Sequence, residues 1–268
     1  MNIVKKGIVI GSALFSAMVS AGDEDIIFIS NFEPAAATVV AYTSFEEPAL
    51  VMGVNDGKYF DTGFFDINHD LINNDGQTAV DLNGTMELDI DARWERYDDL
   101  TDPFDDTMQI PGMTEGDFAG ITTFTPPGNP FTDGVQGYQL SDPDGTMILE
   151  SANVDMSGMT NNEMTMDYFI AQTTWEIDDP ARGNDIRNDA IRIYVENMVT
   201  FERYYILDTL TDTPLTTIID INDLGIAGIW QNASLALPDD VIVRLVVEFR
   251  AGSSAEILWL DNVEFKGL

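Results

Sequence analysis

Apolar residues that recur at every second position are the feature that most constrains the fold of this chain. The apolar side of the run 85–94 is formed by Met86, Leu88, Ile90, Ala92 and Trp94. The same period recurs in four later runs, 163–171, 190–196, 241–249 and 257–265. A period of two is typical of half-buried strands, and helical spacing is nearly absent. Because glycine-, asparagine- and aspartate-rich turns separate these runs, the sequence predicts an all-β fold, an antiparallel β-sandwich of jelly-roll type.

The first residues have the pattern of an export signal. Lys5 and Lys6 precede an uncharged apolar stretch, 7–19, which ends in the small-residue sequence Val19-Ser20-Ala21. This order of charge, apolar run and small residues is typical of a secretory signal peptide. We therefore expect a signal peptide over 1–21, an N-terminal linker over 22–41, a jelly-roll domain over 42–268, and a secreted or periplasmic location.

The composition of the chain, and its charge above all, excludes several classes of function. The 268 residues include 12 Lys+Arg against 47 Asp+Glu, which gives a net charge of −35, and there is no cysteine. In a chain this acidic we do not expect a basic surface that binds nucleic acid. Without cysteine there is no disulfide, thiolate metal site or thiol nucleophile. No later apolar run is long enough to predict a membrane span.

Two short motifs at the ends of the domain resemble known families. The first is Ser44-Phe45-Glu46-Glu47-Pro48, and the second is Leu258-Trp259-Leu260-Asp261-Asn262-Val263-Glu264-Phe265. Together they resemble bacterial carbohydrate-binding modules and the MAM-like and galactose-binding-like domains of adhesion proteins. This resemblance implies an exported jelly roll that binds polysaccharide or cell-surface and matrix partners.

The same resemblance implies a structural calcium ion that ties the first strand to the last. Carried over to this chain, its ligands are Glu46 and Asp261, together with nearby backbone carbonyls. Calcium takes six to eight oxygen ligands, many of them carboxylates, so the acid excess suits such an ion. The alternative is that Glu46 is an ordinary surface acid and Asp261 a turn former.

A ligand-binding surface is suggested by one tryptophan beside an acidic loop. Trp175 is followed by Asp178 and Asp179. An exposed aromatic ring on which a sugar can stack would then lie beside carboxylates that accept hydrogen bonds from sugar hydroxyls. The alternative is a hydrated loop after a buried tryptophan. Two long polar connections, Asp98–Pro111 and Thr122–Gly137, are further places where a binding surface is expected.

An enzymatic alternative rests on three acids in one strand. Alternation places Glu87, Asp89 and Asp91 on the same side of the predicted strand, and paired carboxylates are what glycoside hydrolysis requires. This pattern resembles the catalytic strand of laminarinase-like hydrolases, although Asp91 stands where those enzymes have glutamate. A solvated acidic stripe explains the same pattern. Our leading hypothesis is a non-catalytic, calcium-stabilised binding module, with a glycoside hydrolase or lyase and a protein-binding adhesion module as alternatives.

Overall fold

The computed structural model divides the chain into two compact units, Met1–Ala37 and Thr38–Leu268. The residues that it describes are 36–47, 49–50, 59–60, 68–70, 72–73, 87–95, 117–143, 145–176, 189–209 and 219–268. The predicted signal peptide and most of the predicted linker lie outside these residues. All the described strands belong to the second unit.

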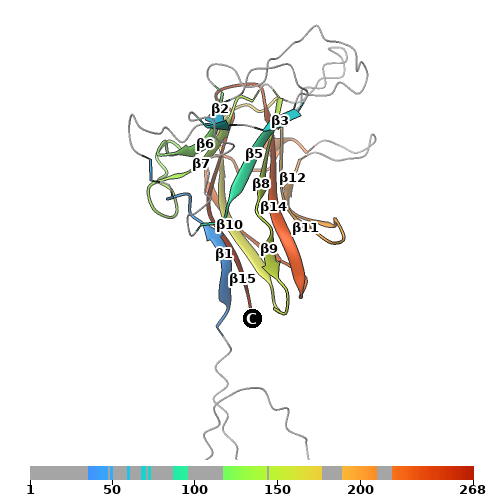
Figure 1. Ribbon diagram of the computed structural model, residues 1–268. Helices are drawn as coiled ribbons and strands as arrows, with labels where there is room; N and C mark the ends of the chain where they lie inside the picture. Colours follow the sequence, from blue (N-terminus) through green and yellow to red (C-terminus); the bar gives the residue numbers. More distant parts are fainter. Residues whose placement is uncertain are drawn as a thin grey trace, which may run out of the picture. The chain divides into compact units, whose positions relative to one another are not determined.

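One layer of this unit is a six-stranded antiparallel sheet, in which β13, β10, β15, β7 and β6 follow one another and β1 also pairs with β15 (Figure 1). Its strands are β1 (Thr38–Thr43), β6 (Phe118–Thr122), β7 (Gly137–Ser141), β10 (Glu163–Ile170), β13 (Trp230–Ala236) and β15 (Ile257–Gly267). The long strand β15 pairs with β7 along its first part and with β1 along its last part. The first and last strands of the unit therefore lie side by side, as the end motifs imply.

The second layer is a seven-stranded antiparallel sheet in the order β12-β11-β14-β8-β5-β3, with β9 also paired to β14. Its strands are β3 (Asn68–Asp70), β5 (Ile90–Glu95), β8 (Gly145–Ser151), β9 (Val154–Met156), β11 (Ala190–Asn197), β12 (Arg203–Asp208) and β14 (Val241–Ala251). A short separate pair joins β2 (Tyr59–Phe60) to β4 (Ile72–Asn73). The chain passes from one sheet to the other between β5 and β6, β7 and β8, β9 and β10, β10 and β11, β12 and β13, β13 and β14, and β14 and β15. These crossings make the predicted β-sandwich of jelly-roll type.

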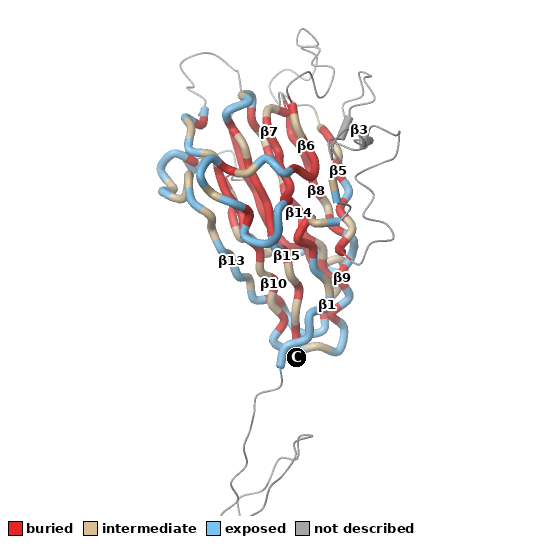
Figure 2. Tube along the Cα trace, turned by 90° about the vertical axis from the view of Figure 1, so that its left-hand side faces the viewer, coloured by how far each residue is buried: buried red, intermediate tan, exposed pale blue. Residues whose placement is uncertain are grey.

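The core lies between the two sheets and is built by the alternating residues. In β10 the inward side chains of Met164, Met166 and Ile170 are fully buried, and so are Ile191 and Ile193 in β11. Figure 2 shows the buried positions following the strands of both sheets. Burying one such side chain contributes roughly 1.5–3 kcal/mol, so the period of two supplies most of the stabilisation.

The sequence prediction differs from the structure at two strand boundaries. Strand β1 begins at Thr38, inside the range assigned to the linker, because Thr38–Thr43 pairs with Val263–Gly267 of β15. Strand β5 begins at Ile90 rather than at residue 85. The only helix among the described residues is the 3₁₀ turn η2 (Ile221–Asp223), so none of these residues forms a helix that could span a membrane.

Candidate functional site

Glu46 and Asp261, the two acids expected to share an ion, bind the same loop. Glu46 follows β1, Asp261 lies in β15, and the loop connects β6 to β7. The Glu46 Oε1 atom accepts hydrogen bonds from the backbone N–H groups of Val135 and Gln136, both at 2.6 Å. Asp261 Oδ2 accepts from the N–H groups of Thr132 at 2.6 Å and Asp133 at 2.9 Å, and from the Thr132 hydroxyl at 2.9 Å. We call Glu46 and Asp261 the loop clamp.

The backbone around the loop clamp is left-handed at three residues. Phe45 has φ 61°, Asn262 has φ 49° and Gly134 has φ 67°. A left-handed backbone is costly for a residue such as phenylalanine and persists only where neighbours enforce it. Here Gln136 Nε2 donates to the Phe45 carbonyl at 2.8 Å, and the Asn262 N–H donates to Asp261 Oδ1 at 2.8 Å. These contacts fix the direction of both carboxylates.

The electrostatics of the loop clamp leave a negative charge without a side-chain cation. Asp261 is fully buried, and this burial raises its pKa to about 6 although four hydrogen bonds favour the ionised form. Among the described residues, neither clamp acid forms an ion pair with Lys or Arg, and Glu46 Oε2 accepts no hydrogen bond. Nor do these residues contain a cluster of three or more His, Cys, Asp or Glu side chains that could hold a metal.

Trp175 is not the exposed aromatic residue that the sequence predicts. Its side chain is 2 % exposed, its Nε1–H donates to the Ala171 carbonyl at 3.1 Å, and its ring meets Phe249 edge-on with centroids 6.3 Å apart. The prediction of an exposed ring at this position is wrong, because the tryptophan fills the core beside β14. Its predicted partners, Asp178 and Asp179, lie outside the described residues.

The three acids of the enzymatic alternative do not form one open carboxylate face. Glu87 precedes β5 and is 8 % exposed, and its two oxygens accept hydrogen bonds from Thr43 Oγ1 and Ser44 Oγ, both at 3.0 Å. Asp89 also precedes the strand and is half-buried, whereas Asp91 lies in β5 and is exposed. Glu87 therefore ties the segment before β5 to the end of β1 instead of facing solvent with Asp91.

The outer side of the seven-stranded sheet forms a site that the sequence did not predict. Every arginine of the described part of the chain lies there: Arg93, Arg192, Arg203, Arg244 and Arg250. They occupy the alternate positions of β5, β11, β12 and β14, whose other side chains enter the core. We call this surface the arginine face.

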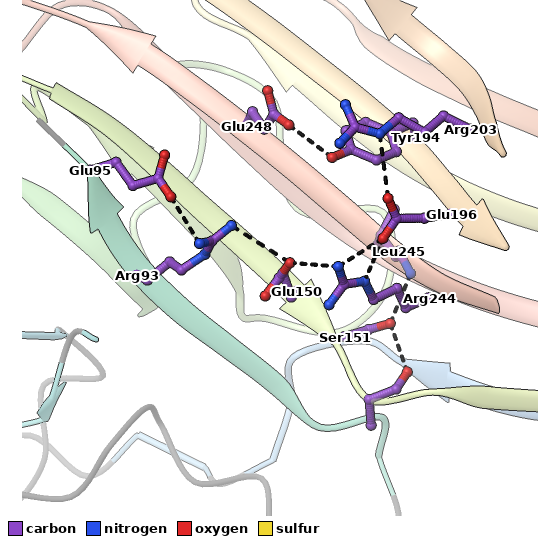
Figure 3. A network of polar contacts seen from close by, with 11 residues as sticks. Arg93, Glu95, Glu150, Ser151, Tyr194, Glu196, Arg203, Arg244, Leu245 and Glu248 are labelled. Atoms are coloured by element: carbon purple, nitrogen blue, oxygen red, sulfur yellow. Dashed lines mark hydrogen bonds and ion pairs between the residues drawn. The ribbon is translucent and has the colours of Figure 1, made fainter. Parts of the chain in front are cut away.

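A continuous chain of ion pairs crosses the arginine face from strand to strand (Figure 3). Arg203 Nε lies 3.4 Å from Glu196, whose other oxygen lies 2.7 Å from Arg244 Nη2. The same Nη2 lies 3.0 Å from Glu150 Oε1, and Arg93 Nη2 lies 3.7 Å from that oxygen. Cation and anion thus alternate across β12, β11, β14, β8 and β5, which fixes each guanidinium in place.

A hollow of about 400 Å³ lies on the arginine face. Beneath the charges is an apolar base of Ile148, Tyr194 and Val246, all nearly fully buried. The Arg203 guanidinium stacks over the Tyr194 ring at 4.7 Å from its centroid, and Tyr205 lies beside that ring with centroids 5.3 Å apart. The Tyr194 hydroxyl donates to Glu248 at 2.8 Å, and its pKa is raised well above its usual range, first by burial and then by the charge of Glu248.

The sequence does carry a signal for this surface. In 190–196 and 241–250 most of the positions between the inward-facing residues carry a large polar side chain: Arg192, Tyr194, Glu196, Arg244, Glu248 and Arg250. In a chain with so few basic residues, their recurrence at period two marks one side of neighbouring strands. The pairing of those strands is what brings them together, and the sequence alone does not give it.

The outer side of the six-stranded sheet is closed instead. Phe169 and Trp259 point away from the core and are buried with Phe131 of the β6–β7 loop. Backbone carbonyls of this loop accept the indole N–H groups, with Phe124 bonded to Trp259 and Pro130 to Trp230, both at 2.9 Å. The β6–β7 loop therefore covers the outer side of the six-stranded sheet, whereas the hollow of the arginine face lies on the outer side of the seven-stranded sheet.

A buried carboxyl pair lies where β11 and β15 begin, because Asp189 directly precedes β11 and Glu256 directly precedes β15. Asp189 and Glu256 are 6 % and 1 % exposed and share a hydrogen bond. Burial raises the pKa of Asp189 to about 6, and burial together with the charge of Asp189 raises that of Glu256 to about 8. The pair retains a proton near neutral pH.

The sequence matches no protein-family model, and no curated protein is similar to it. Solved structures similar to this chain include a carbohydrate-binding module in complex with β-1,4-galactotriose, at 10 % identity and a TM-score of 0.35 over 59 % of this chain and 86 % of that one. A cleaved adhesin domain of Lys-gingipain from Porphyromonas gingivalis is similar at 13 % identity and a TM-score of 0.32, over 58 % and 94 %. A cyclase from Fischerella sp. is similar at 13 % identity and a TM-score of 0.41, over 88 % and 98 %.

Proposed function

We propose that this chain is a non-catalytic binding module for extracellular polysaccharide and that the ligand lies on the arginine face. The observation that carries the proposal is the hollow of about 400 Å³ on a rigid sheet, lined by both hydrogen-bond donors and acceptors. A volume of this size is in the range of small-ligand sites, roughly 300–1,000 Å³. Guanidinium groups donate and glutamates accept, so sugar hydroxyls find both kinds of partner within one patch.

Preorganisation supports the same proposal. The ion pairs hold Arg93, Arg203 and Arg244 before any ligand arrives, so little side-chain entropy is lost on binding. The exposed part of Tyr205 offers an aromatic surface at the edge of the hollow, and a sugar ring can stack on such a surface.

Affinity electrophoresis through gels that contain single polysaccharides tests the proposal. We expect at least one polysaccharide to retard the wild-type protein and Tyr205→Ala to migrate as it does in an empty gel. Phe124→Ala is the matched control, because it removes an aromatic side chain that is also exposed but contacts Trp259 of the other sheet. Migration unchanged in every gel, with and without calcium, excludes polysaccharide binding and leaves a protein partner.

The proposal includes a calcium ion held by the loop clamp. The support is the pair of hard oxygen ligands: a buried carboxylate from the last strand, and a carboxylate after the first strand with one oxygen left over. Calcium prefers such hard oxygen ligands and would supply the positive charge that no described side chain gives Asp261. The bound ion would fix the loop to both ends of the sandwich.

A further inference from the structure

The arginine face is the one place in the described part of the chain where cations gather. Five arginines and three glutamates, Glu95, Glu150 and Glu248, line the hollow, and Glu196 and Asp208 pair with these arginines, so cations and anions are balanced on this face. The chain as a whole has a net charge of −35. The one lysine of the described part, Lys266, pairs with Glu163 and Glu264 in the other sheet. A surface that only needed solubility would carry the same acid excess as the rest.

The guanidinium groups of Arg203 and Arg244 form the outer layer of this face where β12, β11 and β14 lie side by side. Arg203 is 37 % exposed and Arg244 27 %, whereas Glu196 between them is 7 % exposed. A ligand approaching this point therefore meets two cations first, with the compensating carboxylate beneath them. At Arg192 the order is reversed, since its side chain is 7 % exposed and its partners Asp208 and Glu248 are more exposed.

Donors remain available on these two arginines. Glu196 and Glu150 take the Nε and Nη2 groups of Arg244, and its Nη1 group contacts no acceptor among the described residues. Arg203 uses Nε for Glu196 and also forms a side-chain hydrogen bond with Tyr205, while its plane lies over Tyr194. Two guanidinium groups that flank one buried carboxylate and keep free N–H groups form a fork suited to a carboxylate or sulfate.

Building on the proposed function, we propose that the ligand is an acidic polysaccharide whose carboxylate or sulfate groups bind between Arg203 and Arg244. The acidic surroundings favour this ligand over a nucleic acid. A duplex carries one charge per 1.7 Å or so and would place many phosphates against acidic surface outside the hollow. A polysaccharide strand engages the hollow with one or two charged groups, and its hydroxyls bind Glu150 and Glu248.

The test compares polysaccharides that differ in charge but share a backbone. Polygalacturonate is set against its neutral methyl ester, and dextran sulfate against dextran, so that the carboxylate and sulfate sources are separated. We expect tighter binding to the charged member of at least one pair. That binding should weaken several-fold when NaCl rises from about 0.05 to 0.5 M, because exposed ion pairs are screened.

Single substitutions locate the effect. Arg203→Gln, in the edge strand β12, should weaken binding to the acidic polysaccharide roughly tenfold, the factor that corresponds to about one charged hydrogen bond. Arg203→Lys should restore part of it. Lys266→Gln is the matched control and should leave the dissociation constant unchanged. The thermal midpoint of each variant shows that it is folded.

Three outcomes overturn the inference in distinguishable ways. Binding to neutral polysaccharides alone, with no dependence on salt or on Arg203, removes the acidic ligand and leaves the proposed function standing. No binding to any polysaccharide removes both. Binding of duplex DNA with the same dependence on Arg203 assigns the face to nucleic acid instead.

Discussion

The carboxyl pair Asp189–Glu256 makes the stability of the protein depend on pH. In the unfolded chain both groups titrate near pH 4, whereas burial raises the folded pKa values to about 6 and about 8. Between about pH 4 and pH 8 the folded state binds more protons than the unfolded chain, so the free energy of unfolding decreases as pH rises. This loss of stability is complete above about pH 8. We expect the thermal midpoint to fall by at least roughly 5 °C between pH 5 and 8.5.

Repulsion within this acidic chain acts in the same direction, so the pair is isolated by substitution. Glu256→Gln should flatten the pH profile. Glu264→Gln changes a more exposed acid of β15, the strand that follows Glu256, and this acid pairs with Lys266, so the variant should keep the wild-type slope. Thermal unfolding across the pH range measures both. A Glu256→Gln profile parallel to that of the wild type would contradict the assignment.

For single residues, the sequence predicted burial better than role. It predicted the inward side chains of β10 and β11, because alternation alone decides which residues face the core. For Trp175 it left both an exposed ring beside an acidic loop and a buried ring open, and the ring is buried against core residues such as Phe249. Local sequence carries no information about a neighbour that comes from β14.

For whole elements, period-two runs located β10, β11, β14 and β15 to within a few residues, but not their partners. The arginine face needs that pairing, since Glu196 meets Arg203 on one neighbouring strand and Arg244 on the other. The end motifs went further, because they came from a resemblance that already includes the pairing of the first and last strands. That pairing is confirmed by β1 and β15.

The loop between β6 and β7 depends on a glycine beneath Glu46. A Cβ atom at Gly134 would overlap the Glu46 carboxyl group, and the backbone there has φ +67°. Gly134→Ala should therefore displace Glu46, break its bonds to Val135 and Gln136, and lower the free energy of unfolding by roughly 2–3 kcal/mol. Chemical denaturation measures the change.

Gly128 in the same loop is the matched control. It has φ +77°, but an added Cβ would meet nothing within 4 Å. Gly128→Ala therefore carries the backbone strain alone and should cost about 1 kcal/mol. Equal losses in the two variants would show that the contact with Glu46 contributes nothing.

On the scale of the whole molecule, the net charge of −35 describes the surface on average but not locally. Composition argued against a basic surface, yet the fold gathers every described arginine on one face. The charges that remain are mostly acidic and repel one another. A sandwich without disulfides has to offset that repulsion through its core and through any cation that it binds.

A calcium ion in the loop clamp would act on the molecule as a whole, because it would join the segment after β1 to β15 and to the loop between them. Calcium at about 100 times its dissociation constant stabilises the folded state by about 2.7 kcal/mol. For a domain of this size we expect the thermal midpoint to rise by roughly 5–10 °C relative to a chelated sample. Sodium chloride at equal ionic strength separates this effect from general screening.

Two neighbouring glutamates distinguish a specific site from diffuse binding to an acidic surface. Glu46 bonds to the loop, whereas Glu47 beside it is exposed. Glu46→Gln should therefore abolish the increase in midpoint with calcium, and Glu47→Gln should retain it. An equal midpoint with and without calcium in the wild-type protein would remove the ion from the proposal. The stability of the sandwich would then rest on its core and on hydrogen bonds such as those that tie Glu46 and Asp261 to the loop.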